Sequence, residues 1–248
     1  LSGVNLSGVD LSGHDLSDSV LVVANLSEAN LTGVDLSGRD LSGVNLSGVD
    51  LSGHDLSDSV LVGANLSEAN LTGVDLSGRD LSGVNLSGVD LSGHDLSDSV
   101  LVVTNLSEAN LTGVDLSGID LSGVNLSGVD LSGHDLSDSV LIGTDLSEAN
   151  LTGVDLSGID LSRSLLMMTN LSEADLTNSN LYYSNLHGAN LDRAVLDKTD
   201  LEGANLEGVD FRNVELKRVN FNDSKLVFTN FSKKDLSGMD FESSYIKH

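Results

Sequence analysis

Acidic side chains at a fixed interval are the residues of this chain best suited to chemistry. An aspartate stands at every twentieth position through residues 1–160. The eight members of this acidic file are Asp15, Asp35, Asp55, Asp75, Asp95, Asp115, Asp135 and Asp155. If twenty residues form one coil of a stacked backbone, neighbouring members lie about 4.8 Å apart, and such proximity needs water, cations or a basic partner to offset it. Three interpretations stay open: a solvated face, a partner surface and a cation site.

Four histidines accompany this file, each directly before an aspartate: His14, His54, His94 and His134. A regular histidine row beside carboxylates could sense pH. The alternative is structural, with each imidazole hydrogen-bonded to an aspartate or to the backbone. Successive histidines would be two coils, or about 9.6 Å, apart, which is too far to share one zinc ion. Calcium takes several converging oxygen ligands, which a single file hardly supplies. We therefore expect no metal and no other cofactor.

The element that must position these side chains is a unit of five residues. Leucine or phenylalanine occupies every fifth position from Leu1 to Phe241 without interruption. A period of five fits neither an α-helix nor a flat strand. It requires a backbone that turns a corner every five residues, so that one apolar side chain always points inward. We call this residue the centre, with positions −2 and −1 before it and +1 and +2 after it.

The residues around each centre also recur, as small or apolar, Asp/Asn, Leu, Ser/Thr and often Gly. Two examples are Val9-Asp10-Leu11-Ser12-Gly13 and Ala29-Asn30-Leu31-Thr32-Gly33. This pattern resembles the pentapeptide-repeat family, A-(D/N)-L-x-x, over the whole chain. The resemblance implies an all-β fold, a right-handed four-sided parallel β-helix with four pentapeptides per coil and about twelve coils. It also implies an inward-facing centre and −2 residue, and the core residues expected include Leu11, Leu51, Leu91, Leu131, Phe211, Phe221 and Phe231.

Two local features qualify this pattern. In Leu-Ser-Gly-Val the third residue of the turn is glycine, as a type II turn requires. A different turn is expected where glycine is missing, as at Asp18, Val23 and Glu28. The −2 residue is usually small, yet His14 and Arg39 and their copies stand there, so strict inward packing is not expected at those sites.

A longer period of forty divides the chain. Residues 1–40, 41–80, 81–120 and 121–160 are nearly identical, and differences include Arg39 and Arg79 against Ile119 and Ile159. Residues 1–160 carry 25 acids and two arginines, a net charge of −23; residues 161–248 carry 13 acids and ten bases, a net −3. We predict an acidic segment, 1–160, and a divergent, charge-balanced continuation, 161–248, in which residues 241–246 cap the helix. The N-terminal end shows no cap.

Faces are numbered by their centres, with Leu1 and Leu21 on face 1, Leu6 on face 2, Leu11 on face 3 and Leu16 on face 4. The acidic file lies on face 4, and face 2 carries a row of asparagines from Asn5 to Asn125 that could bond to one another along the axis. Outward apolar residues gather at face 1 and its following corner. This apolar ridge comprises Val20, Val22, Val60, Val62, Val100, Val102, Val140, Ile142, Tyr182 and Tyr183. It is either a lateral contact with a partner or a second copy, or local packing.

The sequence contains no recognisable catalytic arrangement. Serine is abundant because it occupies the +1 position of nearly every unit, and no phosphate loop, nucleophile elbow or zinc spacing is present. Cysteine is absent, and no apolar run approaches the ~18 residues of a membrane helix, so we expect neither disulfides nor a membrane span. No signal peptide is visible, which favours the bacterial cytoplasm. The compartment stays open, because the chain begins with Leu in mid-repeat and its true N-terminus is expected elsewhere.

We therefore predict a non-enzymatic, rigid scaffold that binds a protein partner or associates with itself. The alternative is an acidic mimic of duplex DNA, which the resemblance suggests because some members of that family occupy the DNA groove of type II topoisomerases such as DNA gyrase. Eight coils spanning about 38 Å with a net charge of −23 carry about one charge per 1.7 Å, close to duplex DNA. The same charge argues against direct binding of nucleic acid.

Overall fold

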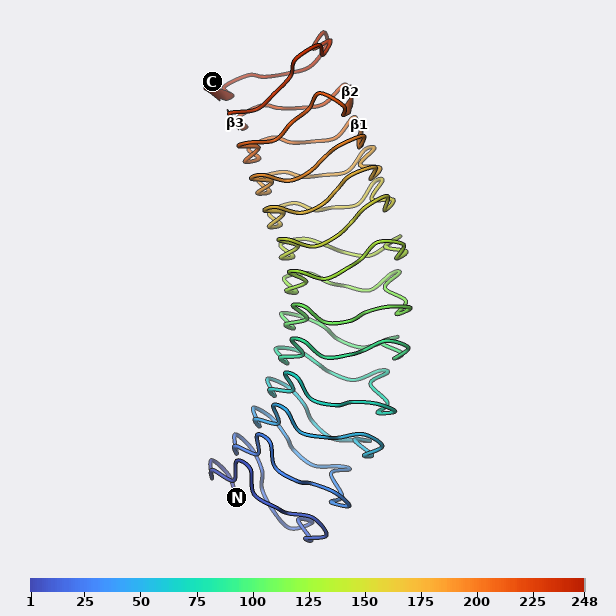
Figure 1. Ribbon diagram of the computed structural model, residues 1–248, viewed down its shortest axis with the longest axis vertical. Coiled ribbons are helices and arrows are strands. Elements are labelled where there is room, and N and C mark those ends of the chain that lie inside the picture. Colours follow the sequence, from blue (N-terminus) through green and yellow to red (C-terminus); the bar gives the residue numbers. More distant parts are fainter. Residues whose placement is uncertain (248) are drawn as a thin grey trace. The chain divides into compact units, whose positions relative to one another are not determined.

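The computed structural model describes residues 1–247, and its backbone turns a corner after every centre residue. Most corners are closed by a hydrogen bond from the −2 amide to the preceding centre carbonyl, as from Val44 to Leu41 at 3.0 Å. The chain divides into two compact units, Leu1–Asp115 and Leu116–His248. Figure 1 shows the successive coils stacked within each unit, coloured blue to green in the first and green to red in the second.

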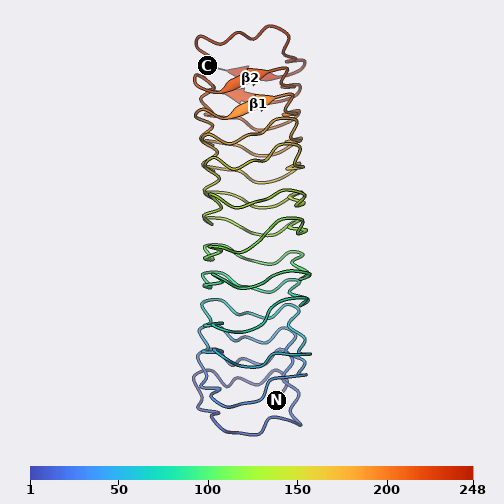
Figure 2. The same ribbon diagram turned by 90° about the vertical axis from the view of Figure 1, so that its right-hand side faces the viewer.

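Parallel backbone hydrogen bonds join residues that are twenty positions apart, one coil above the other. On face 2 the bridges run Asn25↔Asn45 and Asn45↔Asn65, and the Leu26 amide donates to the Asn45 carbonyl at 2.8 Å. In the second unit four consecutive rungs join one coil to the next on all four faces: Asp155↔Asp175, Asp160↔Asn180, Leu165↔Asn185 and Asn170↔Asn190. Each unit is therefore a right-handed four-sided parallel β-helix, as predicted (Figure 2).

Most rungs are single bridges, and within residues 1–247 the longer strands all lie near the C-terminus. Strand β1 (Val195–Asp197) pairs in parallel with β2 (Glu215–Lys217), and β3 (Lys225–Val227) pairs in parallel with β4 (Tyr245–Lys247). The segment predicted to cap the helix, residues 241–246, thus contributes a further parallel rung. Ile246, its centre residue, is exposed.

The centre residues form the core of each unit. Those predicted here that are buried are Leu11, Leu51, Leu91, Leu131, Phe211 and Phe221. Phe231 departs from the prediction because it is partly exposed. Its ring stacks on Phe211 with the centroids 4.6 Å apart. A cavity of about 600 Å³ opens beside Phe231, and its other lining includes Leu236 and Ile246, which do not close over the ring.

The prediction of a different turn where glycine is missing is wrong for Val23 and Glu28. These residues take φ angles of 51° and 55°, in the same left-handed region as Gly48 at 67°. Their corners keep the turn hydrogen bond, from Ala24 to Leu21 at 2.8 Å in the first case. The ladder on both sides fixes the corner, so tertiary structure imposes a conformation that costs a non-glycine residue roughly 1 kcal/mol. Only Asp18 among the three lies outside the positive-φ residues.

Candidate functional site

Aspartates of the acidic file cap the corners that follow them. The amide of Ser17 donates to Oδ1 of Asp15 at 2.8 Å, and the amide of Ser77 donates to Oδ1 of Asp75 at 3.0 Å. The hydroxyl of Ser77 also donates to Oδ1 of Asp75, at 2.7 Å. Serine and aspartate favour such local bonds to the backbone. The carboxylates of the file are therefore held in place while they remain exposed to solvent.

These bonds lower the pKa of several carboxylates of the file. The hydroxyl and amide of Ser17 lower the pKa of Asp15 below its ordinary value, and Asp35 on the next coil opposes this by raising it. Ser77 lowers the pKa of Asp75 in the same way. The hydroxyl and amide of Ser97 also lower the pKa of Asp95, although Asp75 and Asp115 both raise it. Hydrogen bonds to the charged form thus outweigh repulsion between neighbouring carboxylates.

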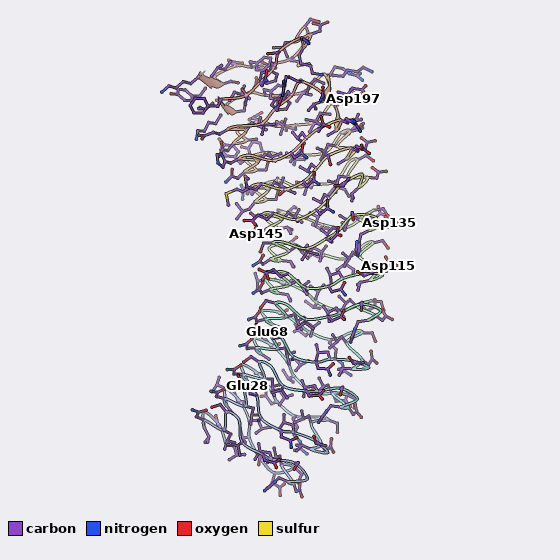
Figure 3. The ribbon with its side chains drawn as sticks, viewed as in Figure 1. Glu28, Glu68, Asp115, Asp135, Asp145 and Asp197 are labelled. Carbon is purple, nitrogen blue, oxygen red and sulfur yellow. The ribbon has the colours of Figure 1, made fainter. Side chains whose placement is uncertain are left out.

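Faces 2 and 4 carry chemically different rows. Figure 3 shows Asp135 of face 4 and Asp145 of face 2 on opposite sides of the second unit. On face 2, Asn25 Nδ2 donates to Asn5 Oδ1 at 3.1 Å and Asn65 Nδ2 donates to Asn45 Oδ1 at 3.0 Å. The predicted amide ladder therefore forms, at alternate steps of the row.

The histidines lie between coils and bond to the backbone. His54 is half-buried, and its Nε2 lies 3.0 Å from the carbonyl oxygen of Leu31. His94 repeats this contact with Leu71 at 2.9 Å. His14 is exposed, and its Nδ1 lies 3.2 Å from the carbonyl oxygen of Ser12. A hydrogen bond to the backbone is the structural alternative that the sequence left open.

A gap opens in the ladder wherever such a histidine is inserted. Bridges join Asp10 to Asn30 and Asp50 to Asn70, but none joins Asn30 to Asp50, where the His54 ring enters. Coils at β spacing leave room at an inward −2 position only for a small side chain. A larger side chain separates the two coils. The result is a cleft of about 450 Å³ with Asp35, Asp50 and His54 in its lining, repeated forty residues later at about 420 Å³.

Arginine and lysine at −2 open equivalent gaps. Arg39 extends back one coil and donates from Nη1 to the carbonyl oxygen of Ser17. No bridge joins Val20 to Asp40, whereas Asp40 pairs with Val60 on the other side. In the second unit Lys234 donates to the carbonyl oxygen of Val214, and the bridge between residues 215 and 235 is missing from the described ladder.

Small −2 residues leave the ladder of face 4 intact. Ala174 and Ala194 are buried, and the bridges run Asp155↔Asp175 and Asp175↔Val195. The forty-residue period of the sequence is therefore the period at which bulky −2 residues interrupt the ladder, namely His in each repeat after the first and Arg39, Arg79 or Ile159 at the second position. These residues are unusual in the sequence pattern, but the pattern did not predict the clefts beside them.

Members of the apolar ridge differ in exposure. In the first unit Val20 is the most exposed, at 60%, and Val60 and Val100 follow. Val22, Val140 and Tyr182 are only half-exposed. Tyr183 is exposed, and its ring meets that of Tyr182 edge to face with centroids 4.5 Å apart. Because Asp40 and Asp80 alternate with the valines of face 1, the ridge of this unit is interrupted by charge.

Further exposed apolar residues lie outside the predicted ridge. Phe228, at 63%, is the most exposed of the large apolar residues, and sequence analysis missed it. The sequence did indicate its exposure, because Phe228 stands at position +2 whereas the other phenylalanines are centres. Leu165 replaces the asparagine of face 2, and Met168 follows at the next corner; both are exposed.

The described residues contain no group of three or more His, Cys, Asp or Glu side chains arranged to hold a metal ion. Within the same part of the chain, no helix has the length and apolar character needed to cross a membrane. The serines that might suggest nucleophiles are used locally, as in the bond from the Ser37 hydroxyl to Asp35 at 2.7 Å.

Comparison with solved structures finds pentapeptide-repeat proteins, and the three described next have TM-scores below 0.5. HetL, described as a protein involved in heterocyst differentiation regulation in the cyanobacterium Nostoc, is 29% identical, with 99% of this chain and 88% of HetL covered and a TM-score of 0.30. Full-length QnrB1, described as a plasmid-mediated fluoroquinolone resistance protein, is 15% identical, with 99% and 92% covered and a TM-score of 0.35. Rfr23 from the cyanobacterium Cyanothece is 32% identical, with 52% and 84% covered and a TM-score of 0.32.

No curated protein matches the chain. The family model of pentapeptide repeats matches eight times, over residues 1–38, 40–78, 80–118, 104–141, 119–158, 130–167, 159–197 and 169–208. These matches span most of the chain and agree with the five-residue corners and twenty-residue rungs of the structure. The chain belongs to the pentapeptide-repeat family.

Proposed function

We propose that this protein is a non-catalytic, rigid scaffold that binds a protein partner through its acidic face. The observation that carries the proposal is the acidic file itself. Its carboxylates are exposed and are bonded in place by the serine two residues later, and the pKa of Asp15 and Asp75 is lowered by these bonds. Fixed charges at regular spacing favour association with a surface of the opposite sign.

A rigid scaffold also accounts for the use of polar side chains. The serine hydroxyls and asparagine amides form turn caps and ladders, as in Ser37 to Asp35 and Asn25 to Asn5. Groups committed to local bonds contribute to a fixed surface rather than to a reaction site. The row of side chains on each face then determines what that face can bind. Face 2 presents amides, and face 4 presents carboxylates.

The test compares two full-length variants with equal changes of charge. One carries Asp15, Asp55, Asp95 and Asp135 replaced by Asn on face 4; the control carries Asp10, Asp50, Asp90 and Asp130 replaced by Asn on face 3. Asparagine keeps the oxygen that caps the corner. Proteins captured by the wild type are identified, and their affinities for purified variants are measured. We expect a loss of about tenfold for face 4 and less than threefold for face 3. Equal losses contradict a specific acidic face.

A DNA-binding protein is a second candidate partner, which makes the chain a mimic of duplex DNA. The ionised file and the net charge of −26 support this version, since phosphate-binding grooves are basic. Supercoiling by DNA gyrase with added full-length protein provides the test. We expect micromolar protein to change supercoiling, with an effect that declines as salt rises. Unchanged supercoiling across this range contradicts the gyrase version.

Self-association remains a separate proposal, based on the apolar ridge. In the first unit Val20, Val60 and Val100 are exposed, and burial of such residues favours association. Native mass measurement of the full chain across concentrations provides the test. We expect a dimer or larger species that dissociates in a Val60→Thr, Val100→Thr variant. A strictly monomeric wild-type chain contradicts self-association.

A further inference from the structure

One cleft of the second unit differs from the equivalent sites of the first and second repeats at a single position. It has a volume of about 400 Å³ and lies between residues 135–140 and 155–160, which belong to consecutive coils. Its lining consists of Asp135, Ser137, Asp138, Ser139, Val140, Asp155, Ser157, Gly158, Ile159 and Asp160. Three of these side chains, Asp135, Asp138 and Asp155, are exposed carboxylates.

The internal repeats supply a comparison for this cleft. Residues 15–20 and 35–40 of the first repeat are identical to residues 135–140 and 155–160, except that Arg39 stands where the fourth repeat has Ile159. The second repeat has Arg79 at the same position. Nine of the ten lining residues are therefore shared with a site that contains an arginine of the chain itself.

The arginine of the first repeat shows what this site accommodates. Arg39 donates from Nη1 to the carbonyl oxygen of Ser17, between two adjacent coils. Its positive charge lowers the pKa of both Asp15 and Asp35, the file members on either side of the gap. Arg79 does the same to Asp55 and Asp75. In the first repeat a guanidinium thus lies in the gap between two coils and interacts electrostatically with the file member on either side.

Isoleucine fills only the inner part of the equivalent gap. Ile159 is buried, with 7% of its surface exposed, and no bridge joins Val140 to Asp160. The amide of Ser157 donates to Oδ1 of Asp155 at 2.9 Å, so the carboxylate is oriented by the same cap as in the sister sites. The fourth repeat keeps the acidic walls and the separated coils but lacks the cation.

We propose that the cleft between residues 135–140 and 155–160 binds the guanidinium of an arginine side chain from a partner protein. The inference rests on the proposed scaffold function and names the group that its acidic face recognises. Arginine fits better than lysine because a planar guanidinium with five N–H donors bonds a carboxylate and a neighbouring oxygen at once. The carbonyl oxygen of Ser137 accepts the Gly118 amide at 2.8 Å, and a carbonyl has a second lone pair for a further donor.

The isoleucines of the chain provide a site-specific probe. The sequence has only four, Ile119, Ile142, Ile159 and Ile246, and their methyl groups can be followed by NMR in the full-length protein. The probes are a capped tri-arginine peptide and a capped tri-lysine peptide of equal charge. We expect a saturable shift of the Ile159 methyl with tri-arginine, about tenfold weaker binding of tri-lysine, and small changes at Ile142 and Ile246.

Variants distinguish binding in the cleft from non-specific attraction between charges. Asp155→Asn keeps the turn cap but removes one wall charge, and we expect about tenfold weaker binding at Ile159. Asp130→Asn, on face 3 and outside the lining, is the matched control, with a change below about twofold. Arg79→Ile removes the internal guanidinium, and the isoleucine methyl that it introduces should shift with tri-arginine. Thermal melting followed by circular dichroism checks that each variant folds.

Equal binding of the two peptides, or equal losses in Asp155→Asn and Asp130→Asn, would overturn the proposal in favour of non-specific electrostatics. Its failure is distinct from failure of the scaffold function. If the chain captures a partner through face 4 but the Ile159 methyl does not respond, the scaffold proposal stands and the arginine cleft is contradicted. An Ile159 response without any face-dependent capture retains the cleft and contradicts the scaffold proposal.

Discussion

The Nε2 atom of His54 lies 3.0 Å from the carbonyl oxygen of Leu31, one coil earlier in the first unit. The bond crosses the gap at which the bridge between Asn30 and Asp50 is missing. Since a carbonyl can only accept, Nε2 carries the proton, and the buried Nδ1 of His54 has no hydrogen-bond partner among the described atoms. One inserted side chain therefore replaces a rung of backbone hydrogen bonds by a single contact.

Replacing His54 by valine should stabilise the protein. A valine fits the −2 position, as at Val44, which is fully buried. The change removes a buried unpaired nitrogen and allows the coils to close, so we expect the free energy of unfolding to rise by about 1 kcal/mol. Thermal and urea unfolding provide the measurement. The control is His14→Val, because His14 is exposed; a change below about 0.5 kcal/mol is expected there. Destabilisation by His54→Val contradicts the prediction.

Acid should destabilise the acidic face. The pKa of Asp15 and Asp75 is lowered in the folded state from the ordinary value of 3.8. A carboxyl with a depressed folded pKa stabilises the fold fully above its unfolded pKa, and this contribution is lost as pH falls through the folded value. We expect melting temperature to be nearly constant above pH 5 and to fall below pH 3.8.

Substitution of the capping serine tests the cause of that pH dependence. The hydroxyl of Ser77 is the largest influence that lowers the pKa of Asp75, so Ser77→Ala should reduce the loss of stability between pH 5 and pH 3. Melting curves of both proteins across this range provide the comparison. A melting temperature that rises on acidification would instead show that relief of repulsion between carboxylates dominates.

Alanine substitutions at two glycines distinguish the cost of backbone strain from the cost of a steric contact. Gly203 and Gly208 have φ angles of 68° and 78°, so alanine at either site costs roughly 1 kcal/mol. A Cβ at Gly203 would also lie 2.8 Å from the Tyr183 ring. A Cβ at Gly208 would have no atom within 4 Å apart from its own residue and its two chain neighbours. We expect Gly203→Ala to be the more destabilising and to alter the near-ultraviolet circular dichroism of tyrosine. Identical effects of both substitutions contradict a steric role for Tyr183.

The phenylalanine stack should dominate stability near the C-terminus. Phe221 is fully buried, and its ring stacks on Phe241 with the centroids 5.0 Å apart. Phe221→Ala should cost about 3–5 kcal/mol because it removes a large buried side chain. Phe228→Ala is the control, since Phe228 is exposed, and should cost less than about 0.5 kcal/mol. Urea unfolding compares the two, and equal costs contradict the assignment of the core.

The five-residue row from Leu1 to Phe241 was sufficient to predict the fold, because a single apolar residue per corner admits few backbone paths. The same row predicted burial of Leu51 and Phe211, but not the partial exposure of Phe231, which depends on how the adjacent segment packs. It also placed the acidic file on one face, since side-chain direction follows directly from position within the unit.

Tertiary structure alone decided what the bulky −2 residues do. In sequence, His54 and Arg39 are departures from a small-residue rule. In the fold, each lies between two coils, bonds to the carbonyl oxygen of Leu31 or Ser17, and replaces a rung. The left-handed corners at Val23 and Glu28 were likewise set by the ladder against local preference. The sequence period determines which residues stack, whereas the spacing between stacked coils depends on side-chain volume, and that spacing creates the clefts.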